Sequence, residues 1–392
     1  MAATGLGAGD MIAASVAGAK YGTTLLWAAV LGAIMKYTMN EGLVRWQLAT
    51  GTTLLEGWVQ RLPKIFSVYF FVYLLLWSFI VAAALIAGTG LAAHALYPEV
   101  SVEIWGIIHS LAALALVLIG RYALLEQAMK LFMGMMMIVV LVCAVLVVPD
   151  SAGIASGLFL PSIPDGSILF IFGVIGGVGG SVTLLCYGYW VREHNWRSRD
   201  DLSKSRTDLV IAYSLTGVFG MAIMVVSAGV SPEVMTGPNM ALGVADHLET
   251  IVGPVGKLLF LIGFWGAVFS SMLGVWQGIP YLFADFVRQY TWQDKEPQPV
   301  DTRSLPYRGY LLYIAIPPML LLLANKPVWL ILMYAVAGAF FMPLLGIVLL
   351  YLNNQRRWLC DLKNGALTNL VLLASVLVFG LLLYFKLAQT LS

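Results

Sequence analysis

The sequence has very little charge. Of its 392 residues only 11% are Asp, Glu, Lys or Arg, whereas 60% are hydrophobic. Soluble globular chains carry roughly 25% charged and 45–50% apolar residues, so the composition excludes an ordinary soluble enzyme. A disordered chain needs low hydrophobicity and high net charge, and the formal net charge of +2 leaves no basic surface for nucleic acid. We therefore expect an integral membrane protein.

Cysteine and the common enzyme motifs are also scarce. Cys143, Cys186 and Cys360 are widely spaced and odd in number, a pattern that favours neither a disulfide framework nor a zinc site. No phosphate-binding loop, Cys-x-x-Cys pair or Gly-x-Ser-x-Gly turn occurs, so nothing indicates an ATP-driven pump or a hydrolase. We expect no enzyme activity, no bound cofactor and no nucleic-acid partner. The expected partners are the lipid bilayer and a small solute, and the oligomeric state is left open.

Long apolar runs, by contrast, are abundant. A bilayer core of about 30 Å needs about 20 apolar residues per helix. Eleven stretches approach this length: Thr4–Ala17, Thr23–Ala49, Ile65–Ala95, Val102–Gly120, Tyr122–Val148, Ser167–Val191, Asp208–Val230, Pro254–Arg288, Tyr307–Leu323, Val328–Leu352 and Leu367–Leu387. The predicted fold class is an all-α membrane protein, with residues 1–392 forming one transmembrane domain.

The distribution of Lys and Arg predicts the topology. With the N-terminus in the cytoplasm and the C-terminus outside, most of the basic residues fall in cytoplasmic connections, as the positive-inside rule requires. Those on the outer side are Lys20, Lys257, Lys326 and Lys386. We expect a bacterial inner (plasma) membrane. Because Met1 lies almost on top of the first span, we also expect that a leading half-helix is missing.

Two spans carry glycine clusters that are unfavourable in a helix. The first contains Gly7 and Gly9, and the sixth contains Gly177 and Gly180 among five glycines between residues 173 and 180. Glycine costs about 1 kcal/mol per residue in a helix interior. Interrupted helices at corresponding positions of two halves are typical of inverted-repeat transporters, which predicts repeats over about 1–150 and 165–352 and an extra helix over about 365–389. The alternative is that the glycines only permit close helix packing.

Asp10 follows the first glycine cluster and is the main candidate for ion binding. A carboxylate at membrane depth is a functional-site candidate by default. Backbone carbonyls around Gly7, Gly9, Gly177 and Gly180, together with the hydroxyls of Ser181 and Thr183, would complete an oxygen site for a hard divalent cation. The alternative is that Asp10 caps a helix that runs from Met11.

A few other polar residues lie within apolar spans. Lys36 is either a fixed cation that pairs with an acid in place of a coupling ion, or a lysine that snorkels toward the cytoplasm. His109 either relays protons or hydrogen-bonds to a neighbouring helix.

Several charged residues have an expected structural role. Glu41 and Arg45, and likewise Glu126 and Lys130, are spaced to form ordinary i,i+4 pairs. The segment Arg192–Arg197 is expected to be a solvated anchor at the membrane interface. Asp10 and Lys36 are then the charges at membrane depth that these roles do not explain.

Several motifs resemble those of Nramp-type metal transporters along nearly the whole chain. The segments Gly5–Asp10 and Ala17–Gly22 are similar to the first two spans of that family, and Gly173–Gly177 is similar to its sixth. Phe264–Gly266 resembles its eighth span and Met342–Leu344 its tenth. The resemblance implies a LeuT-like fold and transport of divalent metal ions with protons.

The metal-site motifs of the family are altered in this chain. The leading Asp of the first-span Asp-Pro-Gly-Asn aligns with Gly7 and its Asn with Asp10. The sixth-span Met and His align with Gly180 and Val182, and the tenth-span Gln aligns with Ala335. The third span contains no Asp or Glu. Losing the thioether weakens selection for soft metals, and losing His and the acids removes the usual proton relay.

The sequence therefore predicts a secondary transporter of a divalent cation of the Mn²⁺/Mg²⁺ class, working by alternating access, with proton coupling left open. The alternative is a transporter of a small organic solute, such as an amino acid or an amine, whose carboxylate would bind at the exposed helix ends. A sensor that keeps an inactive transporter scaffold is a third hypothesis.

Overall fold

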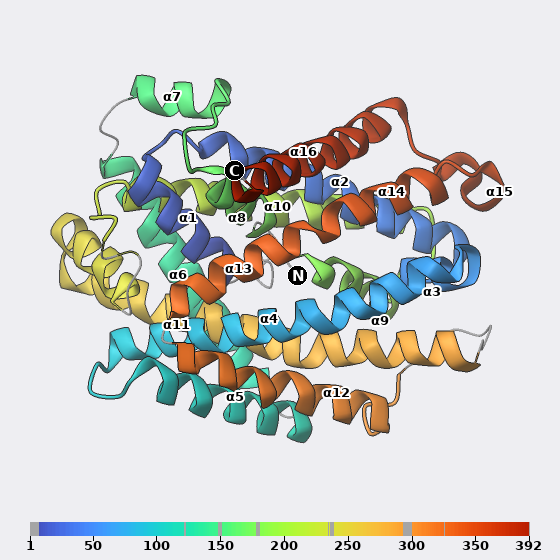
Figure 1. Ribbon diagram of the computed structural model, residues 1–392, viewed down its shortest axis with the longest axis horizontal. Coiled ribbons are helices and arrows are strands. Elements are labelled where there is room, and N and C mark those ends of the chain that lie inside the picture. Colours follow the sequence, from blue (N-terminus) through green and yellow to red (C-terminus); the bar gives the residue numbers. More distant parts are fainter. Residues whose placement is uncertain are drawn as a thin grey trace.

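The computed structural model describes residues 8–120, 123–147, 151–177, 181–233, 235, 239–292, 300–324 and 326–391, except for a few side chains in these ranges, that of Asp10 among them. Within these ranges the chain forms helices and no strand. The long helices run side by side as one bundle (Figure 1). The all-α class predicted from composition is thus confirmed.

Most predicted spans correspond to one helix in the structure. These helices are α1 (Ala8–Tyr21), α2 (Leu26–Thr50), α4 (Lys64–Leu96), α5 (Val102–Ile119), α6 (Ala123–Val147), α10 (Asp201–Ser227), α11 (Met240–Trp292) and α16 (Ala366–Leu391). Helix α10 begins at Asp201 rather than at the predicted Asp208. Helix α11 comprises two helices that meet at a kink at Gly253, with φ 77° and ψ −177°, so the predicted start at Pro254 matches the second of them.

Three predicted spans are each divided into consecutive elements. The sixth comprises α8 (Ile168–Gly177), the 3₁₀ helix η2 (Val182–Cys186) and α9 (Tyr187–Glu193). The ninth comprises α12 (Leu305–Ala315) and η4 (Pro317–Ala324), and the tenth comprises α13 (Pro327–Ala339) and α14 (Phe341–Leu352).

Short segments were not anticipated from the sequence: α3 (Leu54–Arg61), α7 (Ser151–Phe159), and α15 (Arg356–Leu359) with η5 (Cys360–Leu362). They are too short to give a membrane-length apolar run. Helix α3 nevertheless has a strong local signal, since Thr53 and Glu56 form a capping box at its start.

Among the described residues, seven helices are long and apolar enough to cross a membrane, or eight if the bent pair around Asn364 is counted as one span. The predicted eleven crossings therefore stay a prediction. Helix α1 has only 14 residues, and α2 carries Lys36, Glu41 and Arg45 in its interior. Both are shielded by other helices, which relaxes the need for a fully apolar sequence.

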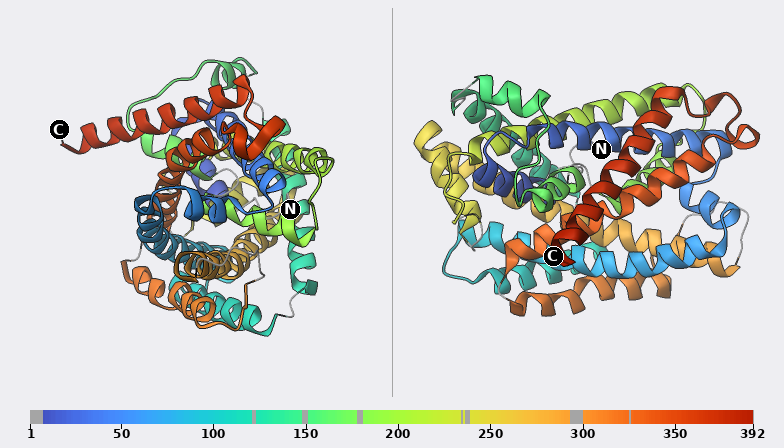
Figure 2. Two further views of the ribbon diagram at one scale, coloured as in Figure 1. Left: turned by 90° about the vertical axis from the view of Figure 1, so that its right-hand side faces the viewer. Right: turned by 45° about the horizontal axis from the view of Figure 1, so that its top comes forward.

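The bundle has an apolar exterior and a packed interior. Large apolar side chains are exposed on the outer helices, for example Ile104 on α5, Ile138 on α6 and Leu370 on α16. Such a surface is unfavourable in water and suits contact with lipid. Helix α4 packs between α5, α11 and α13, whereas α1 packs against α8, α10 and α13. Helix α16 lies on the outside of the bundle, against α14, α2 and α8 (Figure 2).

Candidate functional site at the broken sixth span

The sixth span is interrupted in the interior of the bundle. Helix α8 ends at Gly177, and Ser181 has φ −133° and ψ −93°, outside the helical region, before η2 begins at Val182. Residues 178–180, including Gly180, lie outside the described part of the chain. The last four carbonyls of a helix have no intrahelical partner. The C-terminal end of α8 therefore lies inside the protein with carbonyl oxygens that are not bonded within the helix.

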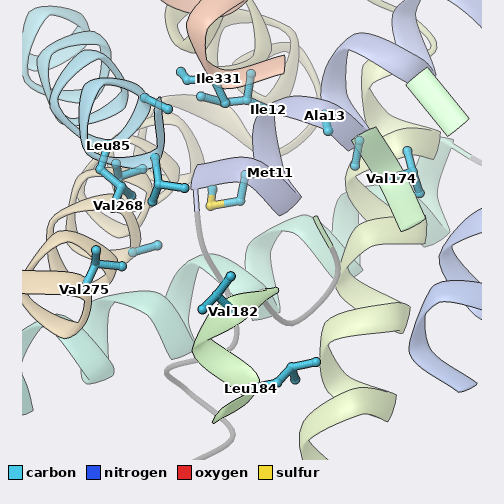
Figure 3. Packing of buried hydrophobic residues seen from close by; sticks show 14 of the residues in the cluster. Met11, Ile12, Ala13, Leu85, Val174, Val182, Leu184, Val268, Val275 and Ile331 are labelled. Atoms are coloured by element: carbon cyan, nitrogen blue, oxygen red, sulfur yellow. The ribbon is translucent and has the colours of Figure 1, made fainter. Parts of the chain in front are cut away.

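Helix α1 lies next to this end of α8. A Cβ atom added at Gly173 of α8 would lie 3.3 Å from the Cβ of Ala13 on α1 and 3.9 Å from Leu332 Cδ2 on α13. Glycine at position 173 thus lets three helices approach closely, which supports the packing alternative for this residue. Figure 3 shows Met11 and Ile12 of α1 in the same interior region as Val182 of η2 and Val268 of α11.

The first predicted break lies only partly in the described chain. Gly7 lies outside it, whereas Gly9 and Asp10 belong to the first turn of α1, which begins at Ala8. Asp10 therefore lies within α1 and does not precede it as an N-cap would, so the alternative of a cap on a helix that runs from Met11 is wrong. An acidic residue in the first turn still interacts favourably with the helix dipole.

Lys36 reaches the end of α8 from α2. Its side chain is 1% exposed, and its Nζ donates a hydrogen bond of 2.7 Å to the carbonyl oxygen of Gly176. Gly32, one turn earlier, allows this approach, because a Cβ there would lie 3.1 Å from Ile175 Cα. A snorkelling lysine keeps its ammonium group at the aqueous interface, so this geometry argues against the snorkelling alternative.

Two buried polar atoms lie near the start of η2. Ser181 and Trp77 are each 1% exposed, and neither Ser181 Oγ nor Trp77 Nε1 has a hydrogen-bond partner among the described residues. A Cβ atom built at Gly338 of α13 would lie 2.8 Å from Ser181 Oγ and 3.7 Å from Trp77 Nε1. A buried donor or acceptor without a partner costs about 1–3 kcal/mol, so this point is suited to a polar ligand. Thr183, on η2, is half-buried.

His109 does not lie at the break. Its Nδ1 donates to the carbonyl oxygen of Trp105 at 2.7 Å, and its Nε2 accepts a hydrogen bond of 2.8 Å from Trp265 Nε1 on α11. Both ring nitrogens are therefore engaged. This geometry supports the hydrogen-bonding alternative over the proton relay.

The described residues contain no group of three or more His, Cys, Asp or Glu side chains that could hold a metal ion.

A second polar cluster closes the end of the molecule that carries α3 and α15, called the α3 end below (Figure 1). Glu56 of α3 is 1% exposed and forms an ion pair with Arg192 of α9. Arg288 of α11 lies 3.9 Å from Glu56 and 2.7 Å from Asp285, which is 0% exposed. The hydroxyl of Tyr189, on α9, donates to Asp285 at 2.8 Å.

This cluster links the second half of the broken span to α3 and α11. Arg192 of α9 pairs with Glu56 of α3, and Tyr189 of α9 binds Asp285 of α11. The expectation of a solvated segment over Arg192–Arg197 is thus wrong for Arg192, which is half-buried and paired with Glu56, whereas most of the following residues are exposed. Asp285 was overlooked, although its i,i+3 spacing to Arg288 within an apolar run is a signal that the sequence does contain.

The two predicted i,i+4 pairs are present. Arg45 lies 2.7 Å from Glu41, and Lys130 lies 2.6 Å from Glu126. The first pair belongs to a larger polar network than predicted. Glu41 also binds Arg206 of α10 at 2.8 Å, and Arg45 binds Asn364 at 2.8 Å.

The helical bundle with its interrupted sixth span defines the chain as a membrane protein of the LeuT-like fold. Its TM-score with MhsT in complex with L-phenylalanine is 0.55, at 13% identity, over 96% of this chain and 97% of that one. With a mutant of the manganese transporter from Eremococcus coleocola the TM-score is 0.74, at 16% identity, over 97% of this chain and 83% of that one.

Comparison of the sequence defines the family within this fold. Residues 1–389 match the family described as natural resistance-associated macrophage protein-like. The chain therefore belongs to the Nramp family, as its motifs indicate. It is 24% identical over 286 residues to the divalent metal cation transporter MntH of Chromohalobacter salexigens. That match covers 66% of this chain and 63% of the relative's length.

Proposed function

We propose that the chain is a secondary transporter that moves a divalent metal cation of the Mn²⁺/Mg²⁺ class across the membrane by alternating access. The observation that carries this proposal is the C-terminal end of α8, which lies inside the bundle next to α1, the helix that contains Asp10. Family membership supports the same substrate class, because the names of MntH and of the Eremococcus coleocola protein specify divalent metal and manganese.

The ion would bind between the two glycine clusters. Asp10 would supply the negative charge, and carbonyls near Gly7, Gly177 and Gly180 would complete the shell together with Ser181 and Thr183. Gly9 lies within α1, so its carbonyl is bonded inside that helix and is not a ligand in this proposal. The unpartnered hydroxyl of Ser181 fits this role. Because no soft ligand replaces the family's methionine at position 180, we propose that the site selects weakly between Mn²⁺ and Mg²⁺.

Alternating access would use the break as a hinge. The cluster of Glu56, Asp285 and Arg288 ties α9 to its neighbours at the α3 end, so the site would reach that side only when this cluster separates. We assign the α3 end to the cytoplasm and the C-terminus to the outside, in a bacterial inner membrane. The two repeats, about 1–150 and 165–352, would be the units that move relative to each other.

Flux into proteoliposomes tests the substrate class. We expect uptake of Mn²⁺ and Mg²⁺, and a comparison with and without an imposed proton gradient measures proton coupling. Uptake of an amino acid or amine without uptake of any divalent cation would contradict the proposal and support the organic-solute alternative. Failure of the protein to transport any solute would support a sensor.

A further inference from the structure

Lys36 places a positive charge at the point where a transported cation would bind. Its Nζ lies 2.7 Å from the carbonyl oxygen of Gly176, in the last turn of α8. The free carbonyls of a helix C-terminus carry a partial negative charge, so they attract a metal ion and an ammonium group alike. A metal ion and Lys36 would therefore use the same oxygen atoms.

The position of Lys36 is fixed by the packing of α2. Its side chain is 1% exposed, and α2 packs against α8, α10 and α16. Gly32 brings the α2 backbone close to Ile175, which sets the distance from which the lysine reaches Gly176. An ammonium group buried at membrane depth is costly, so a hydrogen bond to a free carbonyl stabilises it there.

We infer that Lys36 acts as a tethered cation: its ammonium group occupies the carbonyl end of α8 when no ion is bound, and the transported ion must displace it. This inference rests on the proposed function. If Lys36 must be displaced, it sets the affinity and the selectivity of the transporter for its ion, since a divalent ion competes better than a monovalent one for these oxygens. Once the ion is released, the ammonium group returns and stabilises the empty carrier.

Calorimetric titration of the purified full-length protein with Mn²⁺ tests the inference. In Lys36→Met the dissociation constant is expected to fall at least about tenfold, because the variant removes a like charge a few ångströms from the ion in a medium of low effective dielectric. The matched control is Lys130→Met, which removes an exposed lysine paired with Glu126. It is expected to change the constant by less than about twofold.

A small amine distinguishes competition from a structural effect. In Lys36→Ala, methylammonium is expected to raise the apparent dissociation constant for Mn²⁺ in a competitive manner, because it replaces the missing ammonium group at Gly176. In the wild-type protein and in Lys130→Met it is expected to have little effect. A purely structural lysine would not make the variant sensitive to methylammonium. Lys36→Gln repeats the test if Lys36→Met does not fold.

The outcomes separate the two proposals. If the wild-type protein binds Mn²⁺ and the neutral variants bind with the same or lower affinity, the tethered cation is overturned and the proposed function stands. If no variant, the wild type included, binds Mn²⁺ or Mg²⁺, the proposed function is overturned together with the inference. Tighter binding in the neutral variants, with methylammonium competition in Lys36→Ala, supports both.

Discussion

Asp10 is the acid on which the proposed site depends. It lies in the first turn of α1, and α1 packs against α8 beside the break. We expect Asp10→Ala to abolish calorimetric binding of Mn²⁺, because no group of three acidic, His or Cys side chains elsewhere in the described chain could replace it. The control is Asp246→Ala, since Asp246 is 54% exposed and pairs with Lys257. Unchanged binding in Asp10→Ala would remove this residue from the site.

His109 is expected to stabilise the fold rather than to move protons. It accepts a hydrogen bond from Trp265 and packs edge-on against Phe269, with 5.1 Å between ring centroids. His109→Phe keeps the ring packing but leaves the indole N–H of Trp265 without its partner, at a cost of about 1–3 kcal/mol. The thermal midpoint in detergent is expected to fall, and the effect of a proton gradient on flux is expected to stay. A variant with unchanged stability and no gradient effect would establish a relay.

At the scale of single elements, the cluster at the α3 end is expected to control access to η2. Asp285→Asn weakens the link between α11 and α9 by removing a buried charge that binds Tyr189 and Arg288. Cys186, on η2, is 5% exposed and is a native reporter of opening. In a Cys360→Ser background, we expect a maleimide to label Cys186 several times faster in Asp285→Asn.

The matched control for this experiment is Asp361→Asn. Asp361 also pairs with an arginine, Arg199, at 3.3 Å, but both side chains are exposed and the pair contributes little. If labelling of Cys186 is the same in both variants, the buried cluster does not hold this end closed.

Gly32 tests the contact between α2 and α8. A Cβ there would lie 3.1 Å from Ile175 Cα and 3.2 Å from Ile175 O, both of them backbone atoms that cannot rotate away. Gly32→Ala is therefore expected to destabilise the protein by about 1–3 kcal/mol, as overpacking does, measured as a lower thermal midpoint. Gly134→Ala, on α6 with nothing within 4 Å, should be neutral or stabilising. Equal midpoints for the two variants would show that the helices separate easily.

The sequence indicated an interruption in the sixth span, but not its position or its polar surroundings. Consecutive glycines weaken a helix locally, yet residues 173–177 are helical in α8 and the non-helical residue that the structure describes is Ser181. The capping box of α3 is also a local signal, but an eight-residue helix is too short to form a membrane-length apolar run. Glu56 and Arg192 are separated by 136 residues. Such a pair depends on how two helices pack against each other, and the residue pattern within a single helix does not predict that.

At the scale of the whole molecule, the family and the fold were predictable, but the contacts of the candidate site residues were only partly so. Motifs along the chain indicated the family, and the match over residues 1–389 confirms it. Lys36 was recognised as unusual from its position in an apolar span, but its partner, Gly176, is 140 residues away. The candidate ligands Gly7 and Gly180 lie outside the described residues, so their role stays a prediction.

The orientation in the membrane is the prediction that concerns the whole molecule. The α3 end is rich in positive charge: Arg61 lies with its guanidinium 4.8 Å from the Trp46 ring centroid and 5.0 Å from that of Trp358. Burial and the charge of Arg357 both lower the pKa of Arg61. Such a concentration of arginine favours the cytoplasmic side.

One native and one engineered thiol, at opposite ends of the molecule, can test this orientation. Cys360 is a native exposed residue at the α3 end, whereas Glu99 lies in the exposed turn between α4 and α5 at the opposite end (Figure 1). In right-side-out vesicles, a membrane-impermeant maleimide is expected to label Glu99→Cys in a Cys360→Ser background, but to label Cys360 only after permeabilisation. The reverse labelling pattern would show that the topology is inverted, with the cluster of Glu56 and Asp285 on the outer side of the membrane instead of the cytoplasmic side.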